Sequence, residues 1–200
     1  IGAKEVVVKS LNDPPAIAAL RAANVDLVVY AGGGILRSEI IGLPRLGVLN
    51  GHGGPLPQFR GMNVAEWAVL YGVKPSVSVH WIDVGVDTGP IAYQKPIPSE
   101  SWTDVDHGRG AGAKTAVEAL LEAVARLDRD DLHSVSQRPE NGRLFHVMAS
   151  PLVEVLNHWL SQGRKPQIEP TDFAFPSLAE TFCNFSPPAT VDLAAARESG

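Results

Sequence analysis

The chain of 200 residues has only one cysteine and no long hydrophobic run, and both shortages exclude whole classes of protein. A single cysteine, Cys183, rules out an intrachain disulfide framework and a four-cysteine zinc site. No run of about 18 apolar residues is present, so the sequence offers no transmembrane helix and we expect no membrane partner. A chain without disulfides is typical of a reducing compartment, and we therefore expect a cytoplasmic location.

Basic residues are also scarce relative to acidic ones. The chain carries 17 Lys and Arg against 22 Asp and Glu, which gives a net charge of −5. Because nucleic-acid-binding proteins usually present a basic face, this balance disfavours a nucleic-acid partner. Apolar residues make up 44% and charged residues 20% of the chain, which excludes a wholly disordered or collagen-like protein.

Short apolar runs alternate with a helical pattern in the first part of the chain. Residues 26–30 and 46–50 are compact apolar runs that predict buried strands, and residues 37–41 between them predict a short helix. This alternation predicts the α/β class with a mainly parallel sheet. Such sheets bind ligands beyond the carboxyl ends of their strands, where residues 32–34 and 50–54 lie.

Two later segments have clear periodicity. Residues 76–82 alternate between apolar and polar, which predicts a strand that carries Ser76, Ser78 and His80 on one face. Residues 112–127 predict a helix. Its predicted apolar face consists of Ala113, Val117, Leu120, Leu121 and Val124.

The segment from Asn50 to Gly61 is the richest in groups that carry chemistry. Asn50 and His52 are two residues apart at the end of a predicted strand, so both side chains point to the same side. An amide that stabilises an oxyanion and an imidazole that moves a proton suit acyl transfer. A structural histidine in an irregular surface loop is the alternative interpretation.

A carboxylate is needed to orient such a histidine, and the next loop offers Asp83 and Asp87. Asp87 precedes a turn-like string of Thr, Gly and Pro. Either Asp87 meets His52, or it accepts backbone N–H groups within a turn. Sequence spacing leaves both interpretations open.

The motifs occur in a fixed order: Asn50-x-His52, then Leu56-Pro57-x-x-Arg60-Gly61, then Val79-His80-x-x-Asp83-x-Gly85-Val86-Asp87-Thr88-Gly89-Pro90-Ile91. In this order they resemble the folate-dependent formyltransferase family, over roughly residues 26–124. That family includes glycinamide ribonucleotide formyltransferase, methionyl-tRNA formyltransferase and the nucleotide-sugar N-formyltransferases. The Arg60-Gly61 ending is more similar to the sugar and tRNA branches.

The resemblance implies a Rossmann-like catalytic domain that passes a formyl group from 10-formyltetrahydrofolate to a primary amine, without a metal. By match, Asn50, His52 and Asp87 are the expected catalytic residues. Asn50 and a protonated His52 are expected to stabilise the tetrahedral oxyanion. Asp87 is expected to favour the imidazolium and to help relay the proton of the amine, so activity should fall as His52 loses its proton.

The resemblance also implies two sets of binding residues. Expected to bind the pterin end of the folate are Gly33, Gly34, Ile35, Leu36, Asp83, Gly85 and Val86. Expected to contact the amine substrate are Pro57, Arg60, Gly61 and His80. A structural role for Arg60 and a packed strand histidine at position 80 are the alternatives.

We expect residues 1–165 to form the catalytic domain. It is expected to be N-terminally incomplete, because the family's first βα units are missing. Residues 166–200 are rich in proline and predict a C-terminal tail or arm. Four aromatic residues are expected to anchor this arm on the domain or on a partner subunit, which leaves a homodimer open: Phe173, Phe175, Phe182 and Phe185.

The expected substrate is a small-molecule amine, an amino group on a nucleotide-linked sugar. Residues 151–200 hold three basic and six acidic residues, which is the wrong sign for an arm that binds phosphates. Methionyl-tRNA formyltransferase and formyltetrahydrofolate hydrolase are the alternatives, and a non-catalytic folate-binding module is a further one.

Overall fold

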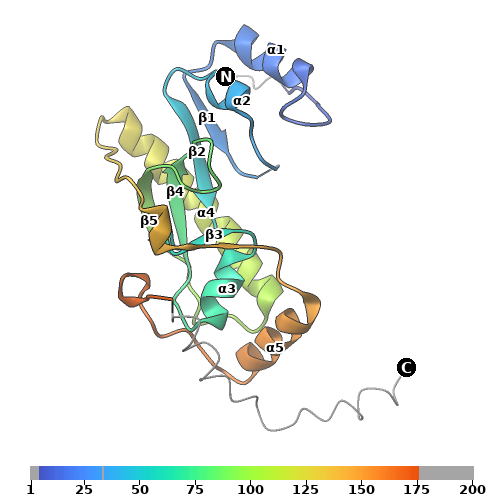
Figure 1. Cartoon of the computed structure of the whole chain (residues 1–200), viewed down its shortest axis with the longest axis vertical. Coiled ribbons are helices and arrows are strands. Elements are labelled where there is room, and N and C mark those ends of the chain that lie inside the picture. Colours follow the sequence, from blue (N-terminus) through green and yellow to red (C-terminus); the bar gives the residue numbers. More distant parts are fainter. Residues whose placement is uncertain (1–4, 33, 176–200) are drawn as a thin grey trace.

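Helices and strands alternate along residues 5–32 and 34–175, which the computed structural model describes (Figure 1). The helices are α1 (Pro14–Ala23), α2 (Ser38–Ile41), α3 (Val64–Leu70), α4 (Val105–Asp128) and α5 (Ser150–Ser161), with 3₁₀ turns at Pro139–Asn141 and Pro170–Asp172. The strands are β1 (Leu27–Tyr30), β2 (Gly47–His52), β3 (Phe59–Gly61), β4 (Ser76–Trp81), β5 (Ile91–Pro96) and β6 (Arg143–Phe145). The predicted α/β class is confirmed. Within this part of the chain, no helix is both long and apolar enough to cross a membrane.

Four strands form one sheet in the order β1–β2–β4–β5. β1 and β2 are parallel, whereas β2 pairs with β4, and β4 with β5, in antiparallel fashion. The prediction of a mainly parallel sheet is therefore wrong for the described strands. A parallel pair needs a crossover that returns the chain to the starting end of the strand. Between β2 and β4 the chain forms only β3 and the short α3, so β4 begins near the end where β2 stops.

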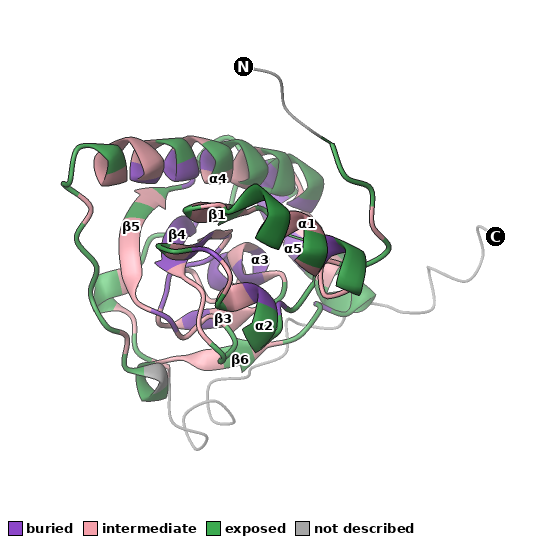
Figure 2. Ribbon diagram, turned by 90° about the horizontal axis from the view of Figure 1, so that it is seen from above, coloured by how far each residue is buried: buried purple, intermediate pink, exposed green. Residues whose placement is uncertain are grey.

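α4 lies along one face of this sheet with its buried side turned inward (Figure 2). It begins at Val105 rather than at residue 112, because the Asp104 side chain caps it by accepting a backbone N–H at 2.8 Å. Glycines in its first turns weaken the helical pattern of the sequence. Gly108 is required by packing, since a Cβ there would come within 2.5 Å of the Trp102 ring.

The buried face of α4 differs from the predicted one. Leu120 is buried as predicted, but Val117 and Leu121 are 55% and 66% exposed. The sheet is instead contacted by small residues such as Ala119 and Ala123, which are fully buried. Small side chains let the helix approach the strands closely, and a pattern search that follows large apolar residues misses such a face.

A second, two-stranded sheet pairs β3 with β6 in parallel, and the sequence did not predict it. The first part of the expected arm, residues 166–175, lies against this region. There the rings of Phe173 and Phe175 pack on Phe59, with ring centroids 5.5 and 5.2 Å from it. The division of the chain at residue 165 stays a prediction. Outside the described residues lie the remainder of the arm, 176–200, and with it Phe182 and Phe185.

Candidate active site

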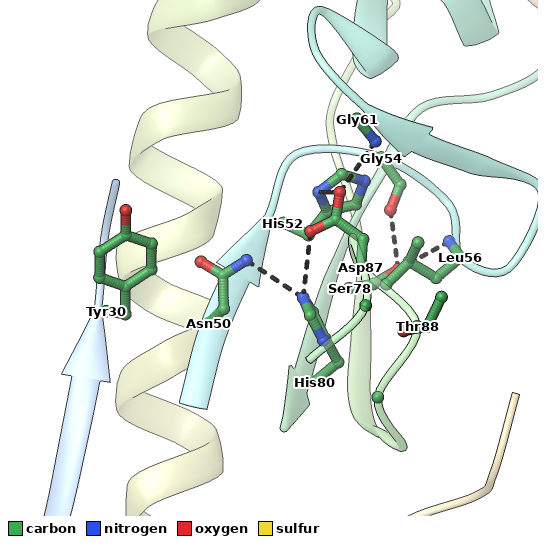
Figure 3. Close-up of polar contacts among 12 residues, drawn as sticks. Tyr30, Asn50, His52, Gly54, Leu56, Gly61, Ser78, His80, Asp87 and Thr88 are labelled. Atoms are coloured by element: carbon green, nitrogen blue, oxygen red, sulfur yellow. Dashed lines mark hydrogen bonds and ion pairs between the residues drawn. The ribbon is translucent and has the colours of Figure 1, made fainter. Parts of the chain in front are cut away.

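β2 and β4 gather polar side chains on one face of the sheet. Asn50 lies opposite His80, and His52 lies opposite Ser78, in the antiparallel register of the two strands. Directly opposed residues, and residues two apart on one strand, share a face. The prediction that Asn50 and His52 point to one side is confirmed, and Figure 3 shows His80 pointing toward the same place.

His52 is held at both ring nitrogens. Its Nε2 lies 2.8 Å from the carbonyl oxygen of Phe59. Because a carbonyl only accepts hydrogen bonds, Nε2 carries a proton. Nδ1 faces Oδ2 of Asp87 at 3.5 Å. The side chain is only 6% exposed, so the ring has little contact with solvent.

Asp87 is the carboxylate that reaches His52. Asp83 instead closes a turn, accepting a backbone N–H at 3.0 Å and the Thr88 hydroxyl at 2.7 Å. Asp87 has a left-handed backbone with φ of 53°, and its Oδ2 accepts the N–H of Gly61 at 2.8 Å. Of the two interpretations that the sequence left open, the structure therefore shows the contact with His52.

His80 completes the cluster from β4. Its Nδ1 donates to the carbonyl of Trp81 at 3.0 Å, so in the neutral ring Nε2 accepts the Asn50 amide at 3.1 Å. Nε2 also lies 3.6 Å from Oδ1 of Asp87. The ring is 2% exposed, because both faces of β4 are covered. The burial of the ring and its contacts with Asn50 and Asp87 are those of the packed strand histidine that was the alternative, and contact of His80 with the amine stays a prediction.

Burial and the neighbouring groups shift the pKa values of His52 and Asp87. It lowers the pKa of His52, and the opposing negative charge of Asp87 does not outweigh it. For Asp87, burial acts to raise the pKa, but the neighbouring His80 and His52 rings and the Gly61 N–H hold the pKa below its ordinary value. Burial therefore favours a neutral imidazole beside a carboxylate near neutral pH, whereas the protonated His52 implied by the resemblance stays a prediction. No sequence pattern reveals this burial.

The geometry of His52 and Asp87 accommodates one further proton. With its Nε2 proton bonded to Phe59, the neutral ring presents a Nδ1 lone pair to a carboxylate oxygen 3.5 Å away. A proton placed between two such acceptors is attracted to both, so it is bound by the pair rather than by either residue alone. The pair is suited to accept one proton during a reaction.

Three residues expected to contact the amine, Pro57, Arg60 and Gly61, are half-buried in or just before β3. Gly61 has φ of 100°, and a Cβ on it would come within 2.1 Å of the Phe145 carbonyl oxygen. Since its N–H is bonded to Asp87, Gly61 supports the carboxylate. Contact of these three residues with a substrate stays a prediction.

The first loop expected to bind folate follows β1. Tyr30, the last residue of β1, is paired with Asn50, so the loop starts beside the polar side chains of the site (Figure 3). Ile35 is 77% exposed, but Leu36 is 8% exposed and packs in the core with Ile40. The side chain of Leu36 therefore packs in the core, and its contact with a folate stays a prediction. Gly34 is described and exposed, whereas Gly33 lies outside the described residues.

The second expected folate loop follows β4 and carries Asp87. Gly85 and Val86 are exposed in it, while the carboxylate of Asp83 is used within the loop itself. A Cβ on Gly85 would come within 2.0 Å of the Thr88 hydroxyl, so this glycine is required by the turn. Contact with folate stays a prediction for both loops. Among the described residues, no three His, Cys, Asp or Glu side chains are grouped to hold a metal ion.

Ser78 was not among the sequence candidates, but it holds the loop between β2 and β3. Its fully buried hydroxyl donates to the Gly54 carbonyl at 2.8 Å. It accepts the N–H of Leu56 at 3.0 Å and the amide of Gln94 at 2.9 Å. Strand alternation placed Ser78 on the polar face, but only the register with β2 shows which loop it holds.

Alanine at position 78 is expected to lower the free energy of unfolding by about 1–3 kcal/mol. The change leaves the buried N–H of Leu56 without its acceptor. Urea denaturation followed by circular dichroism measures the difference. The matched variant Ser134→Ala, at an exposed serine, should stay within about 0.5 kcal/mol of the unmodified protein. Equal losses in both variants would contradict the role of Ser78.

Known proteins resemble this chain in sequence and in fold. The family model described as Formyl transferase matches residues 2–124. A methionyl-tRNA formyltransferase from Microcystis aeruginosa is 30% identical over 73% of this chain and 45% of its own length. A formyltransferase from Anoxybacillus kamchatkensis, solved with a UDP-linked formamido sugar and tetrahydrofolate, gives a TM-score of 0.53 at 22% identity over 62% of this chain and 66% of its own. Methionyl-tRNA formyltransferase from Clostridium thermocellum gives 0.55 at 16% identity over 66% and 56%.

The chain spans about half or less of the curated relatives it matches, between 38% and 51% of their lengths. The solved structures confirm the expected fold. Several of the relatives are methionyl-tRNA formyltransferases by name, so the expectation that disfavoured a nucleic-acid partner is not supported by them.

Proposed function

The chain belongs to the formyl transferase family, and from this premise we propose that it transfers a formyl group from 10-formyltetrahydrofolate to a primary amine. One observation carries the proposal: an amide, a buried imidazole and a carboxylate from Asn50, His52 and Asp87 meet at one place, with His52 and Asp87 3.5 Å apart (Figure 3). These are the groups needed to stabilise an oxyanion and to move one proton.

The proposed reaction begins when the amine nitrogen attacks the formyl carbon. A C–N bond forms, the carbonyl oxygen becomes an oxyanion, and the amine nitrogen becomes positively charged. The Asn50 amide, held by one N–H on His80, has a second N–H for the oxyanion. The pair of His52 and Asp87, an imidazole beside a carboxylate, takes the proton from the amine nitrogen.

Collapse of the tetrahedral intermediate then breaks the bond between the formyl carbon and N10 of the folate. The pair of His52 and Asp87 returns its proton to N10, so that N10 leaves as a neutral amine. Each turnover takes one proton from the amine and gives one to the leaving group. The site residues end in the state in which they began.

Formyl transfer is expected to decline at acid pH. Burial lowers the pKa of His52, so the ring is neutral at pH 7 and gains a proton only below its ordinary value of about 6.5. A ring that is already protonated cannot accept the proton of the amine, so kcat should fall as the pH drops through this range. The measurement is kcat against pH with both substrates saturating, corrected for protonation of the amine itself. A kcat that rises toward acid pH would instead favour a protonated His52 that binds the oxyanion.

For the amine we propose an amino group of a nucleotide-linked sugar. The net charge of −5 supports this choice, because a protein that binds the tRNA backbone needs cations on its binding face. Residues 151–200 carry three basic and six acidic residues, so this part of the sequence offers few such cations.

The second candidate amine is that of methionyl-tRNA, which the names of relatives at 30–34% identity favour. One assay compares the two. The full-length protein is given 10-formyltetrahydrofolate with either a nucleotide-linked amino sugar or methionyl-tRNA, and the formylated amine is detected by mass spectrometry. Asn50→Ala serves as the inactive control.

The same assay tests the alternatives to transfer. Release of formate in the absence of any amine would indicate a hydrolase. Donor binding without turnover on either amine would indicate a binding module, and both outcomes would reject the proposed transfer. Transfer to one amine alone would decide between the two candidates.

A further inference from the structure

Gln137 reaches the Asp87 loop from a segment 50 residues further along the chain. Its Nε2 donates to the carbonyl oxygen of Asp87 at 3.1 Å and to that of Gly89 at 2.5 Å. The Gln137 amide therefore donates hydrogen bonds to the backbone of both Asp87 and Gly89. The sequence did not single out Gln137, because nothing in its local pattern marks it.

The segment that carries Gln137 is itself fixed to the sheet. Val135 pairs with Ile91 at the start of β5, through backbone hydrogen bonds of 2.8 and 2.9 Å in the two directions. Gln137 is two residues beyond this pair and is half-buried. Its amide is thus presented from a backbone that is tied to the same sheet as His52.

The Asp87 backbone needs such support. A non-glycine residue in the left-handed region, here with φ of 53°, is unfavourable and persists only where its surroundings hold it. The preceding residues Gly85 and Val86 are exposed and give the loop little packing. On the other side of Asp87, the bond from Gly61 holds only the carboxylate. The bonds from Gln137 hold the main chain.

The orientation of the Gln137 amide is also fixed. Its Oε1 is buried without a hydrogen-bond partner among the described residues, which is unfavourable for a polar atom. Turning the amide around would place that oxygen against the carbonyls of Asp87 and Gly89. What Gln137 contributes is therefore confined to its two N–H bonds.

From these contacts we infer that Gln137 is a positioning residue, which keeps the Asp87 backbone where the carboxylate lies 3.5 Å from Nδ1 of His52. The catalytic consequence rests on the proposed formyl transfer, whereas the positioning itself is a property of the free protein. Gln137 acts through Asp87 and is not assigned a contact with substrate.

The test replaces Gln137 by alanine and, separately, by glutamate. Glutamate keeps the size of the side chain, but its carboxylate cannot donate to the two carbonyls. Gln162→Ala and Gln162→Glu are the matched controls, because Gln162 is exposed at the end of α5. The first readout is an NMR pH titration of the His52 ring in the absence of substrate, with the signal assigned by its loss in His52→Gln.

The charge of Asp87 raises the pKa of His52, so Asp87→Asn should lower it. The other titratable group that acts on His52 is His80, which these substitutions leave unchanged. Gln137→Ala should lower the pKa of His52 in the same direction as Asp87→Asn, and the Gln162 variants should leave it unchanged. Gln137→Glu adds a negative charge that by itself raises the pKa of His52, so this variant is read from kcat alone. In the transfer assay, kcat should fall about 10- to 100-fold. Combined with Asp87→Asn, a Gln137 variant should cause no further fall.

A pKa of His52 that stays unchanged in folded Gln137→Ala while Asp87→Asn shifts it would overturn the inference, as would losses of kcat that multiply in the double variant. Failure of both Gln137 variants to fold would show a structural residue and would overturn it too. A wild-type protein without formyl transfer, in which the pKa of His52 still depends on Gln137, would reject the proposed function and keep the inference. If formyl transfer occurs while the pKa of His52 does not depend on Gln137, the proposed function is kept and the inference is rejected.

Discussion

Alanine at position 52 is expected to lower kcat for formyl transfer by about 10²- to 10⁴-fold. The change removes the buried ring that, with Asp87 3.5 Å away, is proposed to take the proton of the attacking amine. Steady-state kinetics with both substrates saturating measure the loss. Because the ring is nearly inaccessible to solvent, added imidazole should restore little of the rate.

The exposed His133 provides the matched control, and His133→Ala should keep the wild-type kcat. Since His52 and Asp87 share one proton, the double variant His52→Ala/Asp87→Ala should lose little more than the worse single variant. Near wild-type turnover in His52→Ala, or losses in the double variant that multiply, would contradict the paired role.

Alanine at position 61 is expected to destabilise the fold by roughly 2–5 kcal/mol. The added Cβ would come within 2.1 Å of the Phe145 carbonyl oxygen, at a residue whose φ of 100° already disfavours a side chain. The backbone must move to relieve this clash, and the N–H that bonds Asp87 moves with it. Urea denaturation measures the stability, and kcat should fall even where the variant remains folded.

Gly163→Ala is the control for this prediction. Gly163 also has a positive φ, of 74°, but no described atom lies within 4 Å of a Cβ at that position. Its substitution isolates the backbone strain and should cost about 1–2 kcal/mol without loss of kcat. If Gly61→Ala lost no more stability than Gly163→Ala, the close approach to β6 would not be the cause.

Local periodicity was sufficient to predict part of the site. The two-residue spacing of Asn50 and His52 fixes their common face on any extended strand, and the structure confirms it. The α/β class followed in the same way from short apolar runs separated by a helical pattern. Local periodicity could not predict the contact of Asp87 with His52, because the two residues are 35 positions apart in the sequence. The motif could suggest this tertiary contact, but only the fold could show it.

The features that the sequence missed all depend on what lies across the sheet or above it. The lowered pKa of His52 follows from burial, which depends on neighbours far along the chain. The role of His80 follows from the register of β4 against β2. The mixed sheet follows from the connection between β2 and β4, in which α3 packs beside β3 and α4 and does not return the chain to the starting end of β2. The period of a helix carries no information on where that helix packs.

The aromatic contact beneath β3 has a consequence for the order in which the protein folds. The carbonyl that holds His52 belongs to Phe59, whose ring is covered by Phe173 and Phe175. Close by, a bond between Gln58 and Pro170 joins residues 112 positions apart. Contacts of such long range close later than local ones such as the β4–β5 pair, because more chain entropy must be lost first. During synthesis, the final environment of His52 can therefore form only after the ribosome has released residue 175, when β1, β2, β4 and β5 have all been synthesised.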